Sequence, residues 1–228
     1  MKQVFRHLLS FLFPHTCPIC GKVIEDDNFF CHSCLQSLPR TEQAIIRDNM
    51  TEELFRDIRS FVRGAAFLHF RKDDITQELT HLFKYGNRPD IATALTEEAI
   101  GDLLAADFFD EIDIIMPIPL HPRRLRERGY NQSEYIARAL GKATGIPVDC
   151  SHLVRKVNNP KQATKNASER IENVKDIFEV RYPEDLYHKH VLLVDDIITT
   201  GSTLRSCMKT LRACRSCKVS VFALGKAV

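Results

Sequence analysis

The amino-acid sequence predicts an α/β protein with a mainly parallel sheet, preceded by a small cysteine-rich module. Short buried apolar runs alternate with amphipathic segments along most of the chain, which is the pattern of a parallel sheet with crossover helices. The chain has 228 residues, of which 44% are apolar and 27% charged. It is therefore a globular chain long enough for one α/β domain and an appended module. We place the module at residues 1–48 and the α/β domain at 49–228.

Helices are predicted where apolar residues recur every three or four positions. Asp73 or Asp74 caps a helix that ends at Gly86, and Pro89 opens the next helix, because proline is favoured at the first helical position. In chain order the predicted helices cover residues 51–60, 75–86, 89–104 and 132–144, and a last one includes Leu204, Met208 and Leu211.

Strands are predicted where short apolar runs are bounded by turn residues. Pro117 and Pro119 end one of these runs. Four consecutive apolar residues at 191–194 suit a strand that is buried on both faces of a parallel sheet. In chain order the predicted strands cover residues 65–70, 112–118, 153–157, 178–180, 191–194 and 219–224.

The first 14 residues contain an apolar run at 8–13 that is shorter than the core of a signal peptide and is followed by no small-x-small cleavage site. Its apolar positions lie on one helical stripe, so we expect a short packing helix, with a helix on a membrane surface as the alternative. No later stretch has the roughly 18 apolar residues of a membrane span. We expect a cytoplasmic protein without a membrane span.

Four of the eight cysteines form two C-x2-C pairs separated by ten residues. Each pair presents two thiolates on a tight turn, and two pairs complete a tetrahedral site for structural Zn²⁺. A redox pair and, because we expect a cytoplasmic protein, a disulfide are the less favoured interpretations. His32 is an alternative ligand, and Gly21 fits a turn with positive φ. The predicted metal ligands are Cys17, Cys20, Cys31 and Cys34, whereas Cys150, Cys207, Cys214 and Cys217 are expected to be free thiols.

The stretch from Val191 to Thr203 carries most of the functional information. Two carboxylates follow the buried strand at its carboxyl end, where open α/β sheets bind their ligands. A loop of small hydroxylated residues around a glycine then opens a helix, and its amides, hydroxyls and helix dipole all favour an anion. The acid pair suits sugar hydroxyls or a divalent cation. The predicted sugar-phosphate site consists of Asp195, Asp196, Thr199, Thr200, Gly201, Ser202 and Thr203.

Three other interpretations of this stretch are weaker. A Walker B strand requires a Gly-x4-Gly-Lys-Ser/Thr loop, and no Gly-Lys pair here is followed by Ser or Thr. A phosphorylation receiver domain needs more chain than the 33 residues after Asp195. In the third, the acids and threonines merely cap a helix. The density of features over 13 residues favours the phosphate site.

Two basic segments accompany this motif. The first follows the 112–118 strand and suits phosphate oxygens through bidentate guanidinium groups, with a solvated charge run as the alternative. The second, residues 155–175, lacks apolar periodicity and is expected to be a mobile loop, with a simple surface excursion as the alternative. The candidate residues are Arg123, Arg124, Arg126 and Arg128 in the first segment, and Lys161, Lys165 and Arg170 in the second.

The Asp195 motif resembles the 5-phosphoribosyl-1-pyrophosphate (PRPP) motif of type I phosphoribosyltransferases. The resemblance implies a sheet of that kind, in which Asp195 and Asp196 contact the ribose hydroxyls and residues 199–203 hold the 5′-phosphate. Mg²⁺ accompanies PRPP. The arginine segment then binds pyrophosphate, and the 155–175 segment forms a flexible hood that closes over the ligand.

Further motifs narrow the resemblance to the ComF family. They are the four-cysteine ribbon, Phe83-Lys84-Tyr85-Gly86, Pro117-Ile118-Pro119-Leu120, Arg126-x-x-Gly129-Tyr130-Asn131-Gln132, and Pro160-x-Gln162 with Arg170 and Asn173. The resemblance implies a phosphoribosyltransferase fold and, in some members, a link to the uptake of transforming DNA. It leaves the reaction and the acceptor open.

Two hypotheses follow. In the first, the protein is an enzyme that transfers the phosphoribosyl group of Mg-PRPP to an acceptor and releases pyrophosphate. In the second, it is a non-catalytic competence factor that binds single-stranded DNA, together with other competence proteins, and PRPP is a regulatory ligand. The net charge of +2 is too small to favour nucleic acid by itself. The acceptor pocket, which the sequence does not reveal, separates the two.

Overall fold

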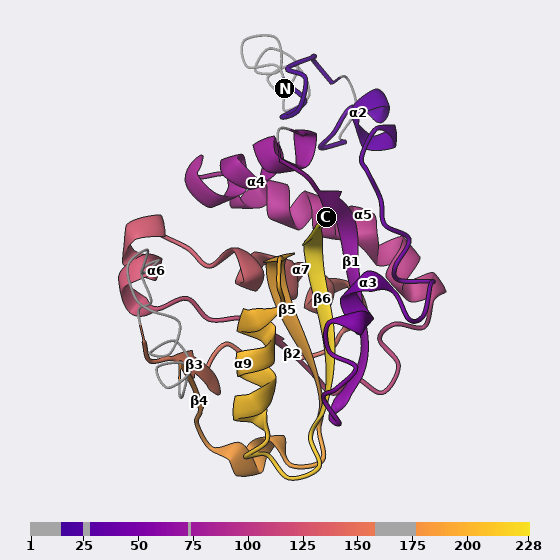
Figure 1. The fold of residues 1–228 in the computed structure, drawn as a ribbon. Helices are drawn as coiled ribbons and strands as arrows, with labels where there is room; N and C mark the ends of the chain where they lie inside the picture. The colour runs from indigo at the N-terminus through magenta and orange to yellow at the C-terminus, as the bar shows by residue number, and fades with distance from the viewer. Residues whose placement is uncertain (1–14, 25–27, 73, 158–176) are drawn as a thin grey trace, which may run out of the picture.

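A computed structural model describes residues 15–24, 28–72, 74–157 and 177–228. The main sheet has four parallel strands in the order β1-β6-β5-β2 (Figure 1). The predicted α/β class with a mainly parallel sheet is confirmed. The strands are β1 (Phe61–Phe70), β6 (Lys218–Ala227), β5 (His190–Ile198) and β2 (Ile114–Pro117).

A second, two-stranded antiparallel sheet stands apart from the main one. It pairs β3 (Leu153–Arg155) with β4 (Phe178–Val180). The sequence predicted both strands, but their shortness and polarity gave no sign that they leave the parallel sheet. They flank residues 158–176, which include the predicted hood residues Lys161, Lys165 and Arg170 and lie outside the described part of the chain.

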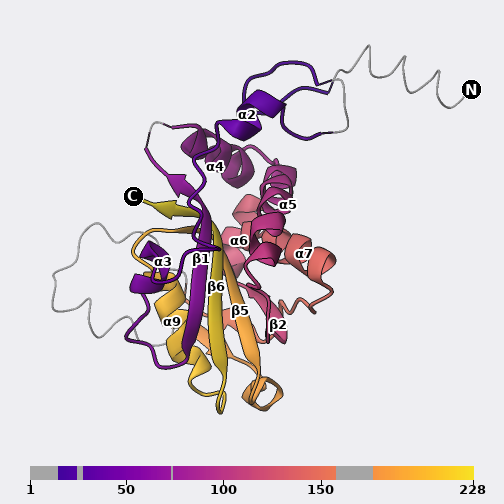
Figure 2. The ribbon, with the colours of Figure 1, turned by 90° about the vertical axis from the view of Figure 1, so that its right-hand side faces the viewer.

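Helices cover both faces of the main sheet (Figure 2). Buried residues of α4, α5 and α7 pack on one face, whereas α9, the β3–β4 pair and the segment after α3 pack on the other. β5 serves both layers, because Leu192 and Val194 face the first and Val191 and Leu193 face the second. The helices are α3 (Met50–Glu53), α4 (Ile75–Tyr85), α5 (Pro89–Ala105), α7 (Gln132–Thr144) and α9 (Ser202–Leu211).

Three predicted element bounds need correction. The helix predicted at 51–60 is only the four-residue α3; Phe55 and Ile58 are buried from a chain of turns that leads into β1. β1 begins at Phe61, four residues earlier than predicted, because Val219 of β6 already pairs there. β5 continues through the acid pair to Ile198, since β6 remains beside it as far as Lys226.

The arginine segment, predicted as a loop, contains helix α6 (Pro122–Arg128). The His121 side chain accepts a hydrogen bond from the Arg123 amide, and Pro122 occupies the first turn. Gly129 ends the helix with a φ of 85°. Proline at the start and glycine just past the end are helix signals. The helix was not predicted because the segment is highly charged and has no apolar stripe.

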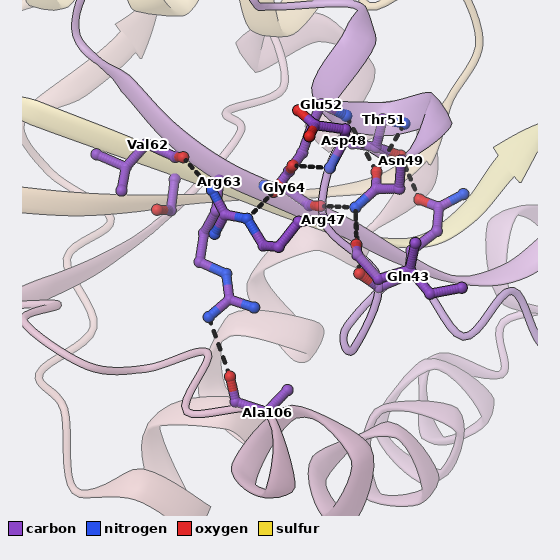
Figure 3. Close-up of polar contacts among 12 residues, drawn as sticks. Gln43, Arg47, Asp48, Asn49, Thr51, Glu52, Val62, Arg63, Gly64 and Ala106 are labelled. Carbon is purple, nitrogen blue, oxygen red and sulfur yellow. Dashed lines mark hydrogen bonds and ion pairs between the residues drawn. The ribbon is translucent and has the colours of Figure 1, made fainter.

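A hydrogen-bonded segment joins the N-terminal module to β1 (Figure 3). The Asn49 amide donates to the carbonyls of Gln43 and Gly64 at 3.1 and 2.9 Å. Glu52 accepts from the amides of Asp48 and Gly64 at 2.8 and 3.1 Å. Buried polar groups are stable only when paired, so these bonds fix the path of the chain from the cysteine module onto the edge of the sheet.

Within the described ranges, no helix combines the length and hydropathy that crossing a membrane requires. The predicted helix at residues 1–14 lies outside those ranges.

Candidate functional site

The parallel register brings the candidate residues to one edge of the sheet. Asp195 pairs with Ala223 near the carboxyl end of β5, and β2 ends beside it, where Pro117 pairs with Val194. The polypeptide leaves β5 for the loop that opens α9 and leaves β2 for α6. Two predicted groups of ligands, the acid pair and the arginine segment, therefore leave neighbouring strands at the same edge (Figure 1).

The two carboxylates of the acid pair have different surroundings. Asp195 Oδ1 accepts hydrogen bonds from the Asp196 amide at 2.8 Å and the Ser133 hydroxyl at 3.3 Å. Asp196 Oδ2 lies 2.8 Å from Lys84 Nζ. Burial, reinforced by the charge of Asp196, raises the pKa of Asp195 to about 7. One carboxylate is thus ion-paired and the other is close to its titration point at neutral pH.

Lys84, for which no role was predicted, lies beside the acid pair. It is in the last turn of α4, within the Phe83-Lys84-Tyr85-Gly86 motif. Its ammonium reaches the acid pair from a helix more than 100 residues away in the chain. The order of the elements could have predicted this position, because α4 follows β1 and the carboxyl end of β1 lies at the same edge of the sheet as the acid pair.

The loop that was predicted to bind phosphate packs against an aromatic ring. Gly201 adopts a φ of 72°, and a Cβ atom there would lie 3.0 Å from the Phe55 ring. Thr199, Thr200 and Ser202 of this loop are exposed. The backbone amides in the first turn of α9 have no acceptor within the helix, and such amides favour an anion.

Two cations lie beside this loop and bond to its neighbours or its backbone. Arg205 forms bonds of 2.7 and 2.6 Å to the two oxygens of Asp57 and also donates to the Leu54 carbonyl. Lys226, at the end of β6, donates to the Thr199 carbonyl at 3.3 Å. Burial lowers the pKa of Lys226. Neither cation bonds to the hydroxyls of the loop, and within the loop the Ser202 amide donates to the Thr200 hydroxyl at 3.4 Å.

The structure divides the predicted arginine group. Arg124 and Arg128 line a cavity of about 490 Å³ together with Lys84. Arg123 instead pairs with Glu127 at 2.9 Å along the helix surface, and Arg126 is exposed. Arg124 and Arg128 are four residues apart, which places them on one face of α6.

A second cavity, of about 410 Å³, lies between the end of β2, α6 and the β3–β4 pair. Arg155, Lys156 and Arg181 line it, together with an apolar wall that includes Leu153. Burial lowers the pKa of Arg155, and the nearby charge of Arg124 lowers it further. Arginine side chains thus lie on both sides of the start of α6.

The four predicted zinc ligands come together. The sulfur atoms of Cys17, Cys20, Cys31 and Cys34 all lie within 4.8 Å of one another. Zinc–sulfur bonds of about 2.3 Å in a tetrahedron separate the sulfurs by about 3.8 Å, so this donor set fits Zn²⁺. Gly21 has the predicted positive φ, 71°.

The remaining cysteines and His32 stay outside this cluster. His32 begins α2 (His32–Gln36) and is not part of the group of potential ligands. The other cysteines are free thiols, as predicted. Burial raises the pKa of Cys214 to about 11 and that of Cys217 to about 12, which makes both unreactive near neutral pH.

Comparison with protein families identifies two domains in the chain. A double zinc ribbon domain matches residues 8–45, and a phosphoribosyl transferase domain matches residues 126–225. The molecule is therefore a phosphoribosyltransferase-like α/β protein with an N-terminal zinc ribbon.

Similar proteins extend this relation across most of the chain. Competence protein F of Haemophilus influenzae is 27% identical to this chain, and the matched region covers 94% of this chain and 86% of that protein. Competence protein ComFC of Bacillus subtilis is 28% identical, covering 92% and 77% respectively. DNA utilization protein YhgH of Escherichia coli is 26% identical, covering 91% and 82%. The chain is a homologue of these proteins, and the predicted resemblance to the ComF family is confirmed.

Gly201→Ala is expected to destabilise the protein, because the new methyl group meets the Phe55 ring at 3.0 Å and the backbone has a positive φ. We expect a loss of more than about 1 kcal/mol in the free energy of unfolding. The matched control is Gly101→Ala in α5, where a Cβ atom meets nothing within 4 Å. This change should stabilise the helix by about 0.5–1 kcal/mol. Urea unfolding of both variants measures the difference, and equal effects would contradict the steric argument.

Cys31→Ser is expected to release zinc, because it removes one of four clustered thiolates. Hydrogen bonds from the Ser33 hydroxyl and the Cys34 amide lower the pKa of Cys31 to about 6, so this ligand is ionised at neutral pH. Metal analysis of the wild type should give one zinc per chain, and the variant should retain less than half. Cys150→Ser, which changes an exposed free thiol, is the control. A variant that keeps its full zinc content would exclude this four-sulfur site.

Proposed function

We propose that the protein binds Mg-PRPP at the carboxyl edge of its sheet and transfers the phosphoribosyl group to an acceptor with release of pyrophosphate. The observation that supports this most directly is the continuity of Asp195, Asp196 and the loop at 199–203, which places a pair of carboxylates directly before the N-terminus of α9. A ribose 5-phosphate has hydroxyls that match the carboxylates and a phosphate that matches the loop.

The 5′-phosphate is assigned to the loop and the first turn of α9. The helix has ten residues, enough for aligned peptide dipoles to favour an anion at its start. Gly201 allows the backbone to turn its amides outward, and Thr200 and Ser202 are exposed to supply hydroxyl donors.

The ribose hydroxyls and Mg²⁺ are assigned to the acid pair. Carboxylate oxygens are hard ligands that suit Mg²⁺, and Asp195 and Asp196 offer them on adjacent residues. Lys84 partly neutralises Asp196 at 2.8 Å, so a divalent cation would compete with or displace that ammonium. Mg²⁺ would supply positive charge to the pyrophosphate oxygens when it binds with PRPP.

The pyrophosphate is assigned to the start of α6, where Arg124 lies near Arg155. Of the other predicted arginines, Arg123 and Arg126 are exposed, whereas Arg128 lines the cavity of about 490 Å³ with Lys84. Guanidinium groups suit paired phosphate oxygens. The hood residues Lys161, Lys165 and Arg170, which lie outside the described part of the chain, are assigned to closing over PRPP.

Transfer breaks the bond between the anomeric carbon and the pyrophosphate oxygen, and that oxygen keeps the electron pair. The acceptor forms the new bond to the same carbon and afterwards loses its proton. Positive charge develops on the sugar ring in between, and the carboxylates of Asp195 and Asp196 would stabilise it electrostatically. Arginine side chains would stabilise the departing anion.

The Asp195→Asn, Asp196→Asn double variant tests the ligand. Titration calorimetry with Mg-PRPP should show binding to the zinc-loaded wild type and at least a tenfold weaker affinity in the variant, because the hydroxyl and cation ligands are lost. The wild-type affinity should also fall as the pH drops through about 7, where Asp195 becomes protonated. Glu53→Gln with Glu111→Gln is the charge-matched control, because it also removes two carboxylates, both from exposed ion pairs outside the proposed site. Absence of binding to the folded wild type would refute the proposal.

A second candidate function is binding of single-stranded DNA in a competence pathway, with PRPP as a regulatory ligand. Two observations favour it: the names of the relatives, which include a DNA utilization protein, and the exposed Tyr85 beside Lys84, Arg124 and Arg128. Aromatic faces next to cations are the chemistry of single-strand binding.

The Arg124→Ala, Arg128→Ala double variant tests this candidate. If DNA binding is genuine, oligonucleotide affinity at low salt should fall by about tenfold and lose part of its salt dependence. Arg56→Ala with Arg138→Ala is the control, because both of these arginines are exposed and paired within their own segments. Fluorescence anisotropy provides the affinities. A wild type that binds no oligonucleotide at low salt would exclude the second candidate.

A further inference from the structure

The cavity of about 490 Å³ beside the acid pair is both cationic and aromatic. Three cationic side chains line it against a single carboxylate, that of Glu127, which is already paired with Arg123 at 2.9 Å. The lining residues are Lys84, Tyr85, Asn87, Arg124, Glu127, Arg128 and Tyr130. Its occupant should therefore carry negative charge.

The two tyrosines give the cavity flat walls. The Tyr85 side chain is 69% exposed, and the Arg128 guanidinium lies 5.2 Å from its ring centroid. The Tyr130 hydroxyl donates to the Phe83 carbonyl at 2.6 Å, which fixes the tilt of its ring. Rings that are held in place offer stacking surfaces at little entropic cost.

Arg128 is oriented by its own contacts. Its guanidinium donates to Gln132 Oε1 at 2.7 Å, and the Gln132 amide in turn donates to the Phe83 carbonyl at 3.4 Å. The stacked and hydrogen-bonded guanidinium keeps further N–H groups for a ligand, since arginine has five. The cation and the aromatic walls are thus parts of one fixed arrangement.

Lys84 connects this cavity with the proposed sugar site. Its ammonium lines the cavity and lies 2.8 Å from Asp196 Oδ2. A molecule in the cavity would therefore be next to the ribose whose hydroxyls are assigned to the acid pair. This is the position that an acceptor needs to approach the anomeric carbon.

We propose that this cavity binds the acceptor, and that the acceptor is a flat heteroaromatic ring bearing a carboxylate. The ring stacks on Tyr85 and Tyr130, and the carboxylate pairs with Lys84 and Arg128. The inference rests on the proposed transferase function. Pyrophosphate is a poorer occupant, because it has no ring and would leave both tyrosine faces unused.

The experiment compares two pairs of probes that differ in charge: nicotinate with nicotinamide, and orotate with uracil. Each is titrated by calorimetry into the full-length, zinc-loaded protein, with and without Mg-PRPP. The acid of at least one pair should bind at least tenfold more tightly than its neutral counterpart. Tyr85→Ala should weaken that binding by about tenfold through lost stacking, while the PRPP affinity changes less than twofold.

Tyr182→Ala is the matched control. Tyr182 is also highly exposed, at 67%, but it lies against His152 and outside the cavity. This variant should bind both PRPP and the acid probe like the wild type. An equal loss in both tyrosine variants would overturn the inference.

The outcomes distinguish this inference from the proposed function. PRPP binding without binding of either acid, or with equal affinity for acid and neutral probes, overturns the acceptor assignment and leaves the PRPP site intact. Displacement of the acid by inorganic pyrophosphate also overturns it. Acid binding that depends on Tyr85 in a protein that does not bind PRPP supports the anion pocket and refutes the transferase.

Discussion

The parallel, in-register pairing of β5 with β6 on one side and β2 on the other is the constraint on which the rest of the site depends. Leu192 and Val194 pack into one helical layer while Val191 and Leu193 pack into the other, so a shift of one residue would exchange the two sets. The register therefore fixes where β5 ends. It sets Asp195 against Ala223 and brings the end of β2 alongside.

Placing two carboxylates at this edge has an electrostatic cost. Burial and the charge of Asp196 raise the pKa of Asp195 to about 7, so the folded protein holds a proton more tightly there than the unfolded chain does. The free energy of unfolding therefore falls as the pH rises from the ordinary carboxyl range towards 7. Lys84 offsets part of this cost at Asp196. An unfavourable electrostatic arrangement of this kind is common at sites whose residues serve ligand binding and not stability.

Local patterns in the sequence were enough to predict the sheet class, the four-cysteine cluster and the buried strand that carries the acid pair. Each depends on spacing within a few residues, as in the two C-x2-C pairs or the run from Val191 to Thr203. What the sequence did not reveal depends on contacts between distant segments. The Arg205–Asp57 pair joins residues 148 positions apart, and the Lys84–Asp196 pair likewise joins two distant segments of the chain. No local periodicity in the sequence predicts either contact.

The predictions for the short helices α3 and α6 were wrong for a different reason. In the turns after α3, Phe55 and Ile58 have helical spacing, but they are buried because the chain packs against Gly201 and α9, with Leu54 partly buried beside them. Burial imposed by a neighbour produces the same apolar pattern as a helix. In α6 the opposite holds: an exposed helix with Arg123 and Glu127 on its surface has no apolar stripe to reveal it.

Lys84 gives the two halves of the site a common element. Its ammonium can pair with Asp196 and also with an anion in the neighbouring cavity. Each of these ion pairs is weaker when Lys84 makes both than when it makes only one. A cation arriving at the acid pair would release Lys84 from Asp196 and leave it available to the cavity. If the proposed assignments hold, the sugar and acceptor sites are coupled: filling the first strengthens the positive potential of the second, and reciprocity requires the converse. The proposed function then predicts an order in which Mg-PRPP binds first and the anionic acceptor follows.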